Sequence, residues 1–203
     1  TQRDVKKSLI DRDIEIDNIR VSWAWAVEQG RVQGLLQIHM GLGELYEVSG
    51  RYGEGVEVFQ RASDRLYDIY QERKGTLNVG YQEIGEIYSQ MLAWQAWFTH
   101  RLGQYEPAQK LLAESLSISD QTASGSQWQR AFPLYQLGAI AWYTGQYDSA
   151  RQYLEEALAI GQRTNGLFAI FTSLTHLGLV EANLGNYQAA RQYHAECLVL
   201  CER

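Results

Sequence analysis

The sequence predicts an all-α protein, built as a solenoid of antiparallel helix pairs. Three observations lead to this fold class. Apolar residues recur at helical spacing along most of the 203 residues. A short pattern of small residues and tyrosine occurs four times. In each copy a glycine lies between two amphipathic segments, where it would end one helix before the next begins.

The segment 131–161 shows one such helix pair clearly. Leu134 and Leu137 fall on one face of its first helix. Gly145 then predicts the end of that helix, because glycine adopts the left-handed cap conformation without a steric clash. Ala150 begins the apolar face of the second helix. Since one pair cannot bury its apolar faces alone, we expect further pairs to stack against it.

The four copies of the pattern share one register. Each copy has a Gly or Ala, a Gly seven positions later, a Tyr two positions after that, and an Ala or Gly three positions further on. The first small residue would let two helices approach closely, and the tyrosine ring would pack at the corner with its hydroxyl in water. The copies start at Gly43, Ala96, Gly138 and Gly178.

This register resembles the tetratricopeptide repeat over roughly residues 33 to 203. The resemblance implies a right-handed superhelix whose first helices line a concave groove. Copies here lie 40 or more residues apart, against about 34 in the family. Such longer repeats resemble those in sensor domains of bacterial signal-transduction ATPases related to the maltotriose-responsive transcription activator. The segment from Asp17 to Arg31 is similar to the one that joins the winged-helix module of those proteins to their repeats.

The whole chain, residues 1–203, is expected to form a single solenoid. Helices that cap its open end are expected over residues 1–32, where Trp23 and Val27 have helical spacing and Gly30 closes the segment. The four repeats are then expected over 33–72, 73–120, 121–163 and 164–203.

Several element boundaries carry specific expectations. The stretch 78–100 fits either one long helix or two helices broken near a glycine. Pro107 is expected in the first turn of its helix, where a missing N–H costs nothing. Pro133 lies either in a first turn or at a kink, depending on where its helix begins. The stretch 122–126 predicts a loop, and 164–166 predicts a helix stop.

Composition restricts the partners that this chain could bind. Its formal net charge is −6, and its lysines and arginines are scattered, which argues against binding to nucleic acid. The sequence has no apolar run of about 18 residues, so no membrane span is expected. It shows no signal peptide either. Two unpatterned cysteines are typical of a reducing cytoplasm. We interpret the chain as a fragment of a longer cytoplasmic protein.

The sequence contains no arrangement typical of an enzyme. It lacks a glycine-rich phosphate loop and the HExxH and GxSxG motifs. The four histidines fall in separate units, and His194 takes the place of a bulky core residue. Cys197 and Cys201 share one helix face without further ligands, which makes a poor zinc site. We therefore expect no catalytic residue, no metal and no cofactor.

The resemblance places binding residues on the concave face, whose middle is aromatic. That face lacks most of the Lys, Asn and Arg side chains with which one subset of the family binds acidic peptide ends. An aromatic groove suits a sugar face, a small apolar ligand or a peptide side chain. Alternatively, these aromatic residues belong to the core. The groove residues implied are Glu44, Trp94, Trp97, Phe132, Tyr135, Trp142 and Asn183.

The predicted function is recognition without catalysis. The main hypothesis is a ligand- or protein-binding sensor module of a larger bacterial signalling or transcription-regulatory protein. Binding in the groove would change how the repeats pack and so bias the neighbouring domains of the parent protein. One alternative is a constitutive protein–protein scaffold, and another is the helical frame of an enzyme whose catalytic part lies outside this chain. The expected groove partner is a peptide, a protein or a small molecule, with no nucleic acid and no membrane.

Overall fold

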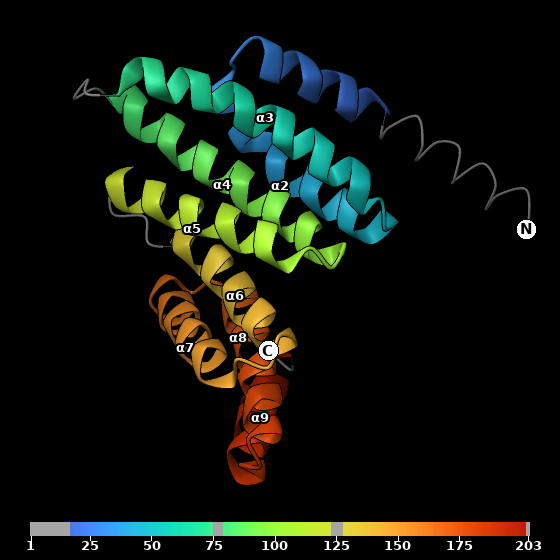
Figure 1. The fold of residues 1–203 in the computed structure, drawn as a ribbon, viewed down its shortest axis with the longest axis vertical. Helices are drawn as coiled ribbons and strands as arrows, with labels where there is room; N and C mark the ends of the chain where they lie inside the picture. Colours follow the sequence, from blue (N-terminus) through green and yellow to red (C-terminus); the bar gives the residue numbers. More distant parts are fainter. Residues whose placement is uncertain (1–16, 75–78, 123–127, 202–203) are drawn as a thin grey trace, which may run out of the picture.

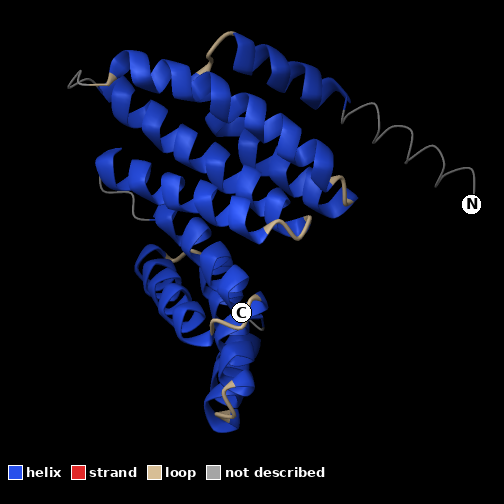
Figure 2. Ribbon diagram, viewed as in Figure 1, coloured by secondary structure: helices blue, strands red, loops and turns tan. Residues whose placement is uncertain are grey.

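The computed structural model describes residues 17–74, 79–122 and 128–201. All regular structure in these ranges is helical, which confirms the all-α fold class (Figure 2). A first helix covers residues 17–28. The helices that follow it are α2 Val32–Ser49, α3 Tyr52–Arg73, α4 Val79–Arg101, α5 Tyr105–Thr122, α6 Trp128–Tyr143, α7 Tyr147–Thr164, α8 Leu167–Asn183 and α9 Tyr187–Cys201.

Consecutive helices stack as antiparallel pairs in two halves (Figure 1). The first half contains α2 to α5, and the second, which lies below it in this view, contains α6 to α9. The two halves join where α5 contacts α6, and this contact is smaller than those of α4 with α3 and α5. The helix over 17–28 packs on α3 through Trp23, whose ring centroid is 5.5 Å from that of Phe59. It therefore covers the outer side of the first half.

A left-handed glycine ends the first helix of each pair, as the sequence pattern predicts. The φ angles are +67° at Gly50, +76° at Gly103, +76° at Gly145 and +83° at Gly185. The stop predicted at 164–166 is also confirmed, because α7 ends at Thr164 and the next residue has a φ of +53°. These turns allow each second helix to fold back onto the first.

The first small residue of the pattern provides close contact between helices. A Cβ at Gly138 would lie 2.6 Å from the Cγ of Leu154 in the second helix of the same pair. At Gly178 it would lie 2.4 Å from the ring of His194. Real Cβ atoms essentially never make such contacts, so a side chain at either position would require its neighbour to move. His194 therefore packs against α8, as expected for a structural histidine.

The structure also resolves the ambiguous boundaries. The stretch 79–101 forms one uninterrupted helix, α4, rather than two. Pro107 is the third residue of α5, in its first turn. Pro133 lies inside α6, well after its start at Trp128, which excludes the first-turn alternative. The loop expected at 122–126 lies outside the described residues, apart from Thr122 at the end of α5.

Candidate binding groove

A pocket of about 320 Å³ opens between the first helices of the four pairs. Its walls come from α2 and α4 in the first half, from α6 and α8 in the second half, and from the turn before α8. The lining is mostly apolar and includes several aromatic rings. Because both halves contribute, anything bound in the pocket would contact both.

Side chains spaced one helical turn apart on α2 line one side of the pocket. Met40, Glu44 and Val48 are four residues apart and so share a helix face. Met40 is 47% exposed and Val48 is 85% exposed. Glu44 is also exposed. This face of α2 thus offers two apolar side chains with a carboxylate between them.

Two tryptophans of α4 form the floor and one side of the pocket. Trp94 is only 6% exposed, and its ring stacks on Phe59 at 5.7 Å and on Phe98 at 5.8 Å. Trp97 is partly exposed, and its Nε1–H donates a hydrogen bond to Glu47 Oε2 at 2.8 Å. Trp94 therefore belongs to the core as well as to the pocket, whereas Trp97 is held in place with its ring accessible.

Glu47 connects the pocket to a charged network. Its Oε1 pairs with the guanidinium of Arg101 at 3.1 Å. Arg101 also donates a hydrogen bond to the Tyr52 hydroxyl at 2.8 Å, and its guanidinium carbon lies 4.9 Å from the centre of the Tyr52 ring. Arg101 is thus paired with Glu47 and does not line the pocket.

Aromatic residues of α6 and α8 complete the wall. The Phe132 ring lies 5.1 Å from that of Trp94, 5.8 Å from that of Trp97 and 6.1 Å from that of Phe168. Phe168 is 59% exposed. The inferred groove residues did not include Phe168, because the family resemblance implies concave positions in the last repeat only from Thr172 onward, one helical turn later. A step of four residues back along the same face would have found it.

Four of the seven expected groove residues line this pocket, namely Glu44, Trp94, Trp97 and Phe132. The other three do not. Tyr135 is 6% exposed, and burial raises the pKa of its hydroxyl to about 12. Trp142 packs against Tyr143 with ring centroids 4.8 Å apart. Asn183 ends α8, where its side chain accepts a hydrogen bond from the Tyr147 hydroxyl at 3.3 Å.

His100 is buried between helices rather than presented to a ligand. It is 7% exposed, and its ring lies 5.9 Å from that of Tyr105 in α5 and 5.5 Å from that of Tyr143 in α6. Burial lowers its pKa to about 4, and the nearby charges of Arg101 and His176 act in the same direction. A neutral imidazole in this setting has a structural role.

The described residues contain no group of three or more His, Cys, Asp or Glu side chains arranged to hold a metal ion. Cys197 is a free, buried thiol, and the Cys201 side chain lies outside the described part. None of the helices in the described ranges has the length and hydropathy needed to cross a bilayer.

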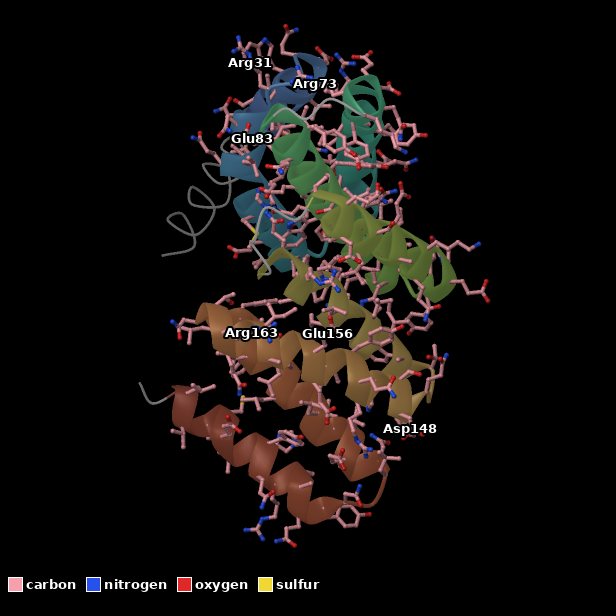
Figure 3. The ribbon with its side chains drawn as sticks, turned by 90° about the vertical axis from the view of Figure 1, so that its left-hand side faces the viewer. Arg31, Arg73, Glu83, Asp148, Glu156 and Arg163 are labelled. Carbon is pink, nitrogen blue, oxygen red and sulfur yellow. The ribbon has the colours of Figure 1, made fainter. Side chains whose placement is uncertain are left out.

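Several charged side chains lie on other parts of the molecule. Figure 3 shows Arg31, Arg73 and Glu83 near one end of the stack, and Glu156 and Arg163 along α7. None of these residues lines the pocket.

Two family models match the chain, and both describe the tetratricopeptide repeat. One matches residues 88–163 and the other residues 171–203, so that together they cover just over half of the sequence. The chain contains tetratricopeptide repeats. The matches confirm the three copies of the Gly–x–Tyr register that start at Ala96, Gly138 and Gly178. No curated protein sequence matches the chain.

Solved structures share the overall fold of this repeat protein. BtubC (BKLC) from P. vanneervenii is 17% identical, with a TM-score of 0.54 over 92% of this chain and 91% of that chain. MamA is 15% identical, with a TM-score of 0.54 over 95% and 92% of the two chains. A putative kinesin light chain of Podosopora anserina with nearly identical TPR-like repeats is 17% identical. Its TM-score is 0.51 over 92% of this chain and 94% of that chain. These likenesses support an all-α repeat superhelix.

Proposed function

We propose that this tetratricopeptide-repeat protein is a scaffold that binds a segment of another protein in the groove between α2, α4, α6 and α8. The observation that carries the proposal is the exposed apolar wall of the pocket, in which Val48 and Phe168 are more than half exposed. Contiguous apolar surface of this kind, flanked by polar residues, is typical of interaction sites. Extended concave surfaces of repeat proteins are used in the same way.

The size and chemistry of the pocket support a peptide-like occupant. Its volume of about 320 Å³ is at the small end of the range for ligand sites, about 300–1,000 Å³. It would hold one or two side chains of a bound segment. The partly exposed rings of Trp97, Phe132 and Phe168 offer the rigid aromatic contacts that contribute most energy at protein interfaces.

A sensor role in a larger cytoplasmic signalling or transcription-regulatory protein is a narrower form of this proposal. It is supported by the resemblance of the longer repeats and of the segment 17–31 to bacterial regulators. The pocket also spans both halves of the solenoid, so an occupant would favour one arrangement of the halves over others. Neighbouring domains of the parent protein would then respond to that arrangement.

Selection from a displayed library of random peptides tests the proposed function. Enriched peptides would be synthesised, and their Kd values measured by fluorescence anisotropy for the parent protein and for Phe168→Ala. The substitution removes an exposed ring from the wall, so we expect binding to weaken at least about tenfold. The matched control is Leu198→Ala on α9, where the side chain is 65% exposed but outside the pocket. Equal Kd values for both variants and the parent would contradict the proposal.

A further inference from the structure

The pocket carries charge of only one sign. Among the described residues that line it, Glu44 and Glu47 are charged, and there is no lysine or arginine. The chain as a whole carries a formal charge of −6. A negative site in a negative molecule repels acidic segments and attracts basic ones.

The two carboxylates differ in what they contact. Glu47 is already engaged, because it accepts a hydrogen bond from Trp97 and pairs with Arg101. Glu44 is exposed and makes no hydrogen bond or ion pair with any residue in the described ranges. Glu44 is therefore the carboxylate that remains available to a bound cation.

Flat rings line the same pocket as this free carboxylate. Trp97 and Phe132 are partly exposed on α4 and α6, and Phe168 is 59% exposed on α8. A guanidinium group is planar and weakly hydrated, so it stacks on aromatic faces while its N–H groups pair with a carboxylate. The aliphatic stem of an arginine would meanwhile lie along apolar side chains such as Met40.

We infer that the groove selects a protein segment that presents an arginine beside an apolar residue. The guanidinium pairs with Glu44 and stacks on the aromatic rings of the pocket, and the apolar neighbour covers Val48 and Phe168. Lysine supplies the charge but not the planar stacking surface, so it binds less tightly. This inference rests on the proposed function and names the chemistry of its partner.

The test uses peptides selected from the same random library. Each selected peptide is also synthesised with its arginine replaced by citrulline, which keeps the shape but carries no charge, and with lysine. Kd values are measured for the parent, for Glu44→Gln and for the control Glu57→Gln, an exposed residue of α3 outside the pocket. We expect enriched peptides to contain arginine. Citrulline and Glu44→Gln should each weaken binding at least about tenfold, and the two changes together should be no worse than either alone.

The outcomes separate this inference from the proposed function. Enrichment of acidic peptides, equal binding of the lysine peptide, or an unchanged Kd for Glu44→Gln would overturn the inference. If Phe168→Ala still weakens binding in those cases, the groove binds segments of another chemistry. If Phe168→Ala and Glu44→Gln both leave the Kd unchanged, the groove is not the binding site. Loss of affinity in Glu57→Gln equal to that in Glu44→Gln would also overturn the inference.

Discussion

At the residue scale, Gly43 allows α2 to pack against Trp94, which lines the pocket. A Cβ at this position would lie 2.5 Å from the Trp94 ring. Because glycine has none, α2 lies directly against the tryptophan, which is stacked on Phe59 and Phe98 on its other sides. The sequence pattern predicts a small residue here for close helix contact, and the structure shows that the contact is with a groove residue.

Two glycines of α2 give a matched prediction for stability. Gly43→Ala forces the buried Trp94 ring to move, so we expect a loss of about 1–3 kcal/mol in the free energy of unfolding. Gly41 is exposed in the same helix, and a Cβ there would meet no described atom within 4 Å. Gly41→Ala should therefore stabilise the protein by about 0.4–1 kcal/mol. Urea denaturation of both variants checks this, and equal midpoints would show that Gly43 is not a contact position.

At the scale of helices, α4 makes contacts on several sides. Its residues line the pocket, and its C-terminal part carries His100 against α5 and α6. This is also where the two halves of the solenoid join. Because His100 is buried at that junction, its protonation would place a charge between the packed helices.

His100 gives a pH prediction whose sign follows from its lowered pKa. The ordinary histidine pKa of about 6.5 applies to the unfolded chain, and the folded value is about 4. Between these two pH values the unfolded state therefore binds more protons than the folded state. The contribution of neutral His100 to the free energy of unfolding is fully present above about pH 6.5 and is lost as the pH drops toward 4. His100→Phe keeps an aromatic ring without the charge. When the pH is lowered from about 7 to about 5, the urea midpoint of this variant should fall less than that of the parent. An equal fall would contradict a lowered pKa of His100 in the folded protein.

Helix boundaries were predictable where a single residue determines them. Glycine at the end of a helix and Asn165-Gly166 after α7 have local conformational preferences that the sequence displays directly. The position of Pro133 was not predictable, because a proline is compatible with a first turn and with a helix interior. Which of these occurs depends on where α6 begins, and the packing of α6 on its neighbours determines that.

At the scale of the whole molecule, the groove exists only because four helix pairs stack. The resemblance to the repeat family implied Glu44, Trp94, Trp97 and Phe132 as groove residues, and all four line the pocket. Spacing alone could not show that α8 packs over Tyr135, whose ring contacts Phe168 at 6.1 Å and His176 at 5.1 Å. These ring contacts help to bury Tyr135, whereas Phe168 stays exposed in the pocket wall.

The sharpest test of the groove is photo-crosslinking of a selected peptide to the intact chain. A benzophenone group would replace the apolar residue beside the arginine of the peptide, and the crosslinked residues would be identified by mass spectrometry. If recognition takes place where we propose, crosslinks will fall on the pocket side of α2, α4, α6 and α8, with Met40 and Phe168 among them. Crosslinks concentrated on α3, on α5 or on α7 before Thr164 would contradict the groove as the binding site.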